Sequence, residues 1–320
     1  MFKLKSILLE ASRDELAAKL TAAFKAGPAE TRKFLDSPDG MSDTVRKDLL
    51  LAPEMDGNDP DDAVEVGSVT GAKASGFKPT QQEIDLMKSV SFPLGSAGTL
   101  ANAIENPETK GIVVSGDFII DGHHRWSGIQ GIAGTDATLS GKDVDWPGTT
   151  SDEMLAAAQI AIAAKLGADK KIPSQSEPFD TNISGKDAQT IAKMALANVN
   201  KKTDPNAPGP LMNDAMMEDL TDSNNANAKI VANWLGLETV ETDADALRRL
   251  IASRVGSNLA ALPSNEAAPE RKDMPQFDDK VGGPDIDDVT PALTGKAGGY
   301  NISPPFVKDG IIKLKDLLGR

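Results

Sequence analysis

One stretch in the middle of the chain, residues 112–126, restricts the fold more than any other. Two short apolar runs, 112–115 and 118–121, flank Gly116-Asp117, which is a strong signal for a tight hairpin turn. The second run leads directly into Gly122, after which apolar residues recur at helical spacing. A hairpin that passes straight into a helix is typical of a domain in which helices pack on a sheet. The stretch therefore predicts an α+β fold.

Hydrophobic periodicity and helix-start signals place the other elements. Capping boxes, in which a Ser or Thr is followed three residues later by Glu, begin at Ser12 and Thr80. We expect a strand at 63–69 and helices at 12–27, 31–35, 42–51, 80–90, 99–105, 122–133, 151–167, 184–199, 222–235, 242–255 and 310–318. Between Gly134 and Ser151 the pattern is weak, and no element is assigned there.

The composition indicates an ordered middle with looser flanks. Aromatic residues make up only 4% of the chain, whereas Gly and Pro are numerous, so parts of it should be loops. Residues 53–62 are acidic and rich in helix breakers, which is typical of a linker. We therefore divide the chain into a helical N-terminal arm with its linker (1–58), an α+β domain (59–150), a mainly helical region (151–262) and a tail rich in Pro, Gly and Asp (263–320).

Charge and cysteine content exclude several classes of protein. The formal net charge is -14, and residues 60–150 contain six Lys or Arg against twelve Asp or Glu, so specific DNA binding is not expected. The absence of cysteine excludes disulfides, thiolate metal sites and a cysteine nucleophile. No run approaches the roughly 20 apolar residues of a membrane span, and residues 1–10 are too short for a secretory signal. These features favour an intracellular or virus-assembled soluble protein without a membrane partner.

The side chains best suited to chemistry gather at the predicted strand-to-helix junction. The only two histidines, His123 and His124, lie between Gly122 and Arg125, directly after Asp121. A glycine at such a junction lets a ligand approach the backbone, and the first N–H groups of a helix attract anions. An arginine adds a planar double donor for phosphate or carboxylate. The residues from Gly122 to Arg125 therefore predict a phosphate-binding turn.

Several alternatives stay open for this junction. A helix N-terminus favours neutral imidazoles, which could donate to a phosphate oxygen or act as a general base. Zinc is not favoured, because adjacent helical residues diverge by about 100° and a third histidine or a cysteine is missing. Asp121 or Asp117 could hold Mg²⁺ that arrives with a nucleotide, and Gln81 or Gln82 could reach a ligand. In the structural alternative, Trp126 is a core residue and the histidines only cap the helix.

Three segments carry a recognisable pattern. They are Val64-Glu65-Val66, Lys78-Pro79-Thr80-Gln81-Gln82-Glu83-Ile84 and Gly116-Asp117-Phe118-Ile119-Ile120-Asp121-Gly122-His123-His124-Arg125-Trp126. Together they resemble the ParB/sulfiredoxin superfamily, especially its phage-encoded ParB-like members, over residues 60–135. The resemblance implies a small mixed sheet with helices and a glycine-led turn that binds the phosphates of a nucleoside triphosphate such as ATP or CTP, with Mg²⁺ as a candidate companion.

Departures from the superfamily pattern narrow what the resemblance implies. His123 stands where sulfiredoxins have a cysteine, so their reductase chemistry is not implied. Partition-type ParB proteins carry Gly-Glu-Arg-Arg, of which Arg125 is the clear match. The free-serine kinases of the superfamily have a more similar turn and use a carboxylate base, which makes Glu65 a catalytic candidate by position alone. His123 and His124 are the other catalytic candidates.

The leading hypothesis is a phage-encoded nucleotide-binding protein that could hydrolyse the nucleotide or transfer its phosphate. The alternative is a virion or assembly protein that uses the same fold as a binding module. Its partners would be other phage or virion proteins or further copies of itself, bound through the N-terminal and C-terminal helices. Both hypotheses place the protein in the host cytoplasm or in the virion. A weaker alternative is a ParB-like nuclease, against which the acidic composition argues.

Overall fold

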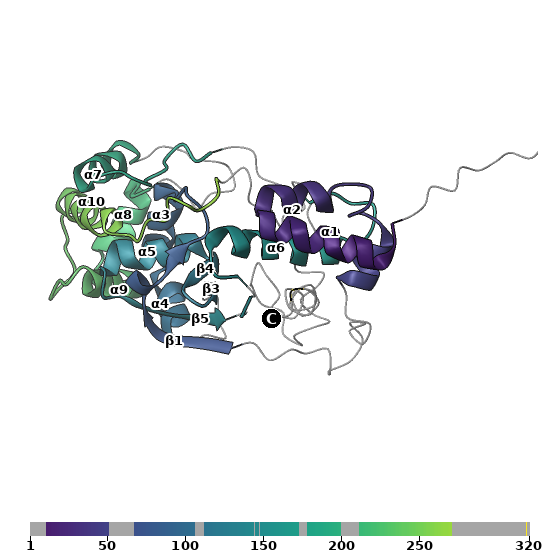
Figure 1. The fold of residues 1–320 in the computed structure, drawn as a ribbon. Coiled ribbons are helices and arrows are strands. Elements are labelled where there is room, and N and C mark those ends of the chain that lie inside the picture. The colour runs from purple at the N-terminus through teal and green to yellow at the C-terminus, as the bar shows by residue number, and fades with distance from the viewer. Residues whose placement is uncertain are drawn as a thin grey trace, which may run out of the picture.

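The computed structural model describes residues 11–50, 67–105, 112–143, 145–146, 148–172, 178–199, 211–270 and Leu318. Helices cover both sides of a five-stranded mixed sheet (Figure 1), so the predicted α+β fold is confirmed. Of the strand predicted at 63–69, residues 67–69 belong to an observed strand and 63–66 lie outside the described residues. The linker at 53–62 and the tail helix, apart from Leu318, also lie outside them.

The sheet has the strand order β1-β5-β3-β4-β2. Its strands are β1 (Gly67–Lys73), β2 (Lys78–Pro79), β3 (Ile112–Ser115), β4 (Phe118–Asp121) and β5 (Thr138–Asp143). The predicted hairpin is confirmed, because β3 and β4 pair antiparallel. The short β2 pairs parallel with the other side of β4, while β5 pairs parallel with β3 and antiparallel with β1. The sheet is therefore mixed.

Strand β5 corrects the sequence analysis, which assigned no element between Gly134 and Ser151. Its sequence, Thr-Leu-Ser-Gly-Lys-Asp, has too few apolar residues to stand out as a strand, and its position depends on pairing with β3. Gly141 lies opposite Ile112, and a Cβ atom there would lie 2.2 Å from the Ile112 carbonyl oxygen. Only a glycine permits this close approach of the two strands.

The two faces of the hairpin are buried in two different cores. Side chains alternate in direction along a strand, which sends neighbours to opposite faces. The first core includes Ile112, Val114 and Ile119, and the second includes Val113, Phe118 and Ile120. This double burial explains why both strands read as continuous apolar runs rather than as alternating ones.

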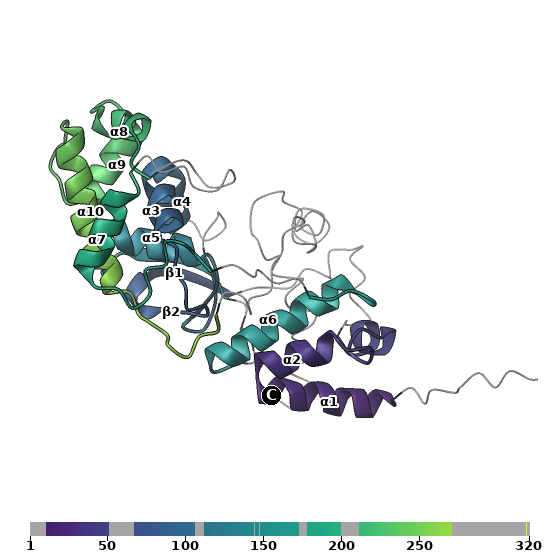
Figure 2. The same ribbon diagram turned by 90° about the horizontal axis from the view of Figure 1, so that it is seen from above.

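The first core lies between one face of the sheet and a group of helices (Figure 2). These are α3 (Leu86–Gly95), α4 (Ala97–Glu105), α5 (His123–Ala133), α7 (Ala188–Ala197), α8 (Asp214–Thr221), α9 (Ala226–Trp234) and α10 (Ala244–Ala260). Helix α8 was not predicted, and α9 begins four residues later than expected, after its cap Asn225. Trp126 is fully buried in this core and donates from Nε1 to the Ala74 carbonyl oxygen (2.7 Å), as its structural interpretation predicted.

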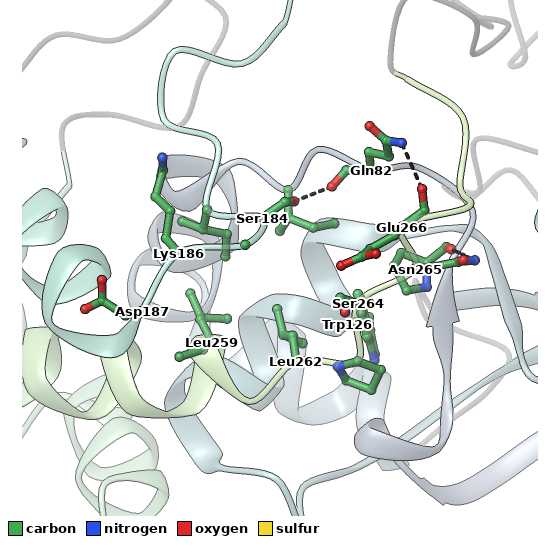
Figure 3. A pocket seen from close by; sticks show the side chains of 16 residues that line it. Gln82, Trp126, Ser184, Lys186, Asp187, Leu259, Leu262, Ser264, Asn265 and Glu266 are labelled. Carbon is green, nitrogen blue, oxygen red and sulfur yellow. Dashed lines mark hydrogen bonds between the residues drawn. The ribbon is translucent and has the colours of Figure 1, made fainter.

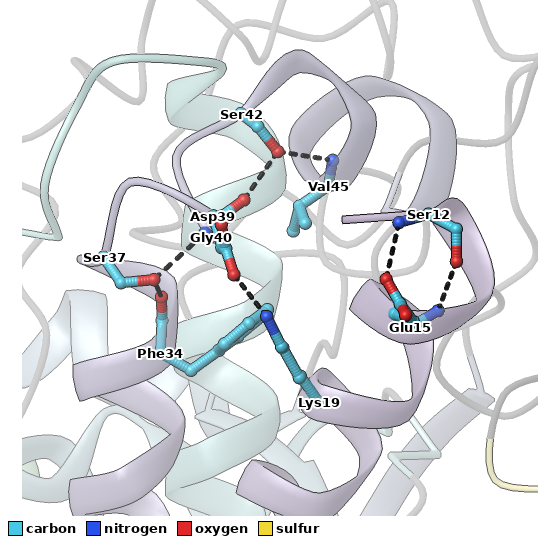
Figure 4. Close-up of polar contacts among 9 residues, drawn as sticks. All are labelled: Ser12, Glu15, Lys19, Phe34, Ser37, Asp39, Gly40, Ser42 and Val45. Carbon is cyan, nitrogen blue, oxygen red and sulfur yellow. Dashed lines mark hydrogen bonds and ion pairs between the residues drawn. The ribbon is translucent and has the colours of Figure 1, made fainter. Parts of the chain in front are cut away.

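The second core joins the N-terminal helices to the opposite face of the sheet. It contains α1 (Arg13–Ala26), α2 (Pro28–Leu35), the π-helix η1 (Thr44–Leu49) and α6 (Ser151–Leu166). The capping box of α1 is present, since Glu15 N–H donates to Ser12 Oγ and Ser12 N–H donates to Glu15 Oε2 (Figure 4). Residues 151–262 thus contribute to both cores, because α6 packs with the N-terminal helices whereas α7 to α10 pack on the first core.

The second capping box is a misprediction. Helix α3 begins at Leu86, and its cap is Asp85, whose carboxylate accepts from Met87 N–H (2.8 Å) and from Thr181 Oγ1 (2.6 Å). Thr80 instead donates its hydroxyl to the Ile119 carbonyl oxygen (2.7 Å), which ties residues 80–84 to β4. The partner of Thr80 is distant in the sequence, so the local pattern around Thr80 gives no sign of it.

Candidate functional site

The junction between β4 and α5 has the backbone shape that the sequence predicted. Gly122 caps α5 in the left-handed conformation, with φ 88° and ψ 23°, and its carbonyl oxygen accepts from Trp126 N–H (2.9 Å). A Cβ atom at Gly122 would lie 3.1 Å from Ile112 Cγ2 and 3.1 Å from the Arg125 guanidinium. The junction therefore requires glycine for its backbone angles and for its close contacts.

Arg125 and Asp121 face each other across this glycine. A guanidinium nitrogen lies 3.0 Å from Asp121 Oδ2, and the two side chains are 20% and 25% exposed. The pair fixes the guanidinium beside the start of α5 while leaving part of it open to solvent. Asp121 partly balances the positive charge, so the backbone dipoles of the first helical turn add to the attraction that the guanidinium exerts on an anion.

His123 is buried and serves as a hydrogen-bond acceptor. Its side chain is 6% exposed, and the backbone N–H of Thr80 donates to its Nε2 (3.2 Å). The Thr80 hydroxyl oxygen also lies 3.3 Å from the same nitrogen, so two contacts join His123 to Thr80. Nε2 is therefore already in contact with Thr80 and is not open to a substrate. This geometry favours a positioning role for His123 over the catalytic role that was expected.

His124 lies against a segment that the sequence analysis did not connect with the site. Its ring meets Phe179 edge to face, with the centroids 5.4 Å apart and the planes at 81°. The ammonium of Lys88, on α3, lies 5.1 Å from the centroid of the same Phe179 ring. Phe179 and Lys88 are thus neighbours that sequence reasoning missed, and no local pattern marks either of them.

The other predicted site residues are arranged as follows. Gln81 follows Thr80 and is 6% exposed, but its Nε2 donates to the Glu83 carbonyl oxygen (2.9 Å), so its amide closes its own loop. Asp117 lies in the hairpin turn at the opposite end of β4 from Asp121, where it pairs with Lys78 (2.8 Å). Glu65 lies outside the described residues.

A divalent metal does not fit this arrangement well. In the described part of the chain, no group of three or more His, Cys, Asp or Glu side chains could hold a metal ion. The Asp121 carboxylate, which was the expected Mg²⁺ ligand, is paired with Arg125 instead. A metal at Asp121 would have to displace the guanidinium, so no step of the function proposed below is assigned to Mg²⁺.

Comparisons with known proteins found no relative of this chain. No family model matches the chain, and neither the curated proteins nor the solved structures contain a match. Within the described residues, none of the helices is both long and apolar enough for a membrane crossing. The fold and the junction define an α+β protein whose mixed sheet leads, through a left-handed glycine, into a helix that begins His-His-Arg.

Proposed function

We propose that the turn from Gly122 to Arg125 binds the phosphates of a nucleoside triphosphate such as ATP or CTP. The observation that carries the proposal is the left-handed Gly122 at the start of α5, with the Arg125 guanidinium held against it. A glycine without a side chain lets a phosphate approach the first backbone N–H groups of the helix. The resemblance to the ParB/sulfiredoxin superfamily supports the same assignment.

The residues of the turn have different roles in this proposal. Arg125, which is oriented by Asp121 and partly exposed, donates to the phosphates. His124 is less buried than His123 and packs on Phe179, so we assign to it, rather than to His123, the role of donor to a phosphate oxygen. His123 fixes the turn to the loop at Thr80. Hydrolysis or phosphate transfer would require a base, for which Glu65 remains the candidate by resemblance.

Isothermal titration calorimetry with ATP, CTP and GTP tests the proposal. We expect saturable binding of at least one of them to the wild-type protein and at least a tenfold loss of affinity in Arg125→Ala, which corresponds to about 1.4 kcal/mol. Arg249→Ala is the matched control, because Arg249 is an exposed arginine on α10. The proposal fails if none of the three nucleotides binds, or if the two variants behave alike.

A second candidate function is assembly with other phage or virion proteins. It is favoured by the second core, in which α1, α2, η1 and α6 add a helical unit to the face of the sheet that α5 does not cover. In this proposal the protein resides in the virion, whereas the first proposal also suits the host cytoplasm. Mass photometry of the purified protein and proteomics of purified particles test it. A monomer that is absent from particles would contradict it.

A further inference from the structure

A cavity of about 600 Å³ lies beside the loop at 79–84, apart from the phosphate turn (Figure 3). Its floor is apolar and includes the buried side chains of Ile84, Ile183 and Leu259. Its walls come from the loop before α7 and from the segment that follows α10. Of α5 only Trp126 lines it, and none of residues 121–125 does. Its size and apolar floor are those of a small-molecule site.

The segment that follows α10 forms one wall of the cavity and is held in place by amide groups. Asn265 Nδ2 donates to the Pro79 carbonyl oxygen (3.1 Å), and Gln82 Nε2 donates to the Glu266 carbonyl oxygen (3.1 Å). The backbone N–H of Gln82 also donates to the Pro269 carbonyl oxygen (3.0 Å). Since each side-chain amide must direct its nitrogen at a carbonyl oxygen, its own oxygen is left to accept a hydrogen bond.

Acceptors also dominate the rest of the rim. The Ser184 hydroxyl donates to the Gln82 carbonyl oxygen, which leaves its lone pairs for a ligand. Figure 3 shows the Glu266 carboxylate directed over the apolar floor, while Lys186 extends away from it at the opposite rim. Asp187 adds a second negative charge, and hydrogen bonds from Thr190 keep the pKa of its carboxyl below the usual value. The cavity thus combines an apolar floor with a carboxylate and several free acceptor oxygens.

We propose that this cavity is a binding site for a small amphipathic organic cation, an amine with an apolar body. The apolar body would cover Ile84, Ile183 and Leu259, and the ammonium would donate to Glu266 and to the amide oxygen of Asn265. An anion of the same shape would meet the carboxylate, and a neutral molecule would lose the charge-assisted hydrogen bond. None of residues 121–125 lines the cavity, so this site is distinct from the phosphate turn.

Three ligands of one shape test the charge requirement. These are 2-phenylethylamine, 2-phenylethanol and phenylacetate, titrated into the full-length ¹⁵N-labelled protein and followed by amide chemical shifts. We expect saturable shifts with the amine, confined mainly to residues 183–187 and 259–266. The alcohol should bind about tenfold more weakly, as expected for the loss of a charge-assisted hydrogen bond, and the acid should not saturate.

Two variants locate the site. Glu266→Gln should weaken the amine about tenfold, whereas Glu238→Gln, at an exposed residue between α9 and α10, should have no effect. Ala260→Phe, which adds a ring at the rim, should weaken the amine and the alcohol alike. Unchanged melting temperatures show that the variants fold. The proposal is overturned if the amine does not saturate, if the three ligands bind equally, if the shifts lie elsewhere, or if Glu266→Gln binds like the wild type.

Discussion

Arg46 is the residue whose loss should most selectively weaken the second core. It lies on η1 and is fully buried, and its guanidinium donates to four backbone carbonyl oxygens. They belong to Gly40 (2.8 Å), Ala163 (2.6 Å), Leu35 (2.7 Å) and Lys170 (3.2 Å). One side chain therefore joins η1 to α6, to the end of α2 and to two loops.

The magnitude follows from the competition between hydrogen bonding and desolvation. Each hydrogen bond from a charged group contributes about 1.5–3 kcal/mol, so four of them outweigh any single apolar contact in this core. Burial opposes them and lowers the pKa of Arg46 to about 10, but the group stays charged at neutral pH. Arg46→Met keeps the bulk and removes every donor. After the desolvation cost is recovered, we expect a net loss of about 3–5 kcal/mol.

Hydrogen exchange followed by mass spectrometry is the suitable assay, because it resolves the two cores separately. In Arg46→Met, amides of α1, α2 and α6 should exchange much faster, while those of α7 and α10 should change little. Arg46→Lys should be intermediate, since one ammonium cannot reach all four carbonyls. Arg13→Met, at an exposed residue of α1, is the control. A loss below about 1 kcal/mol, or equal acceleration in both cores, would show that Arg46 does not hold the second core together.

Three further predictions concern the junction and helix α7. Gly122→Ala should lower the free energy of unfolding by about 1–2 kcal/mol in thermal melts, because φ at this position is 88°. The added methyl group should also crowd Arg125 and weaken nucleotide binding in calorimetry. His123→Phe should cost about 1–3 kcal/mol in urea unfolding, because the buried Thr80 N–H loses its acceptor. Hydrogen bonds from Thr190 lower the pKa of the Asp187 carboxyl in the folded protein. The carboxylate therefore stabilises α7 at a pH above the unfolded pKa, and this stabilisation is lost as the pH falls through the folded pKa. Asp187→Asn should remove this acid sensitivity, as measured by circular dichroism.

The parts of the fold that local signals encode could be predicted from the sequence. The hairpin of β3 and β4 has its turn dipeptide between two apolar runs, and Gly122 stands where a strand gives way to a helix. The capping box at Ser12 also forms as expected, because Ser12 and Glu15 need only each other. In each case the partners are a few residues apart.

The parts that depend on distant partners could not be predicted. Strand β5 is stabilised by pairing with β3, and its Gly141 is needed because of Ile112. Thr80 matched a capping box, but its hydroxyl binds the carbonyl oxygen of Ile119 and its N–H binds His123, which is 43 positions away. The same contact supports a positioning role for His123, which the sequence makes a catalytic candidate.

A crystal structure with a bound nucleoside triphosphate tests the central claim most directly. We expect a phosphate within hydrogen-bond distance of the Arg125 guanidinium and of backbone N–H groups in the first turn of α5, beside Gly122. His123 should keep its contact with Thr80 in the complex. Phosphates bound elsewhere on the protein, with Arg125 still paired only to Asp121, would contradict it.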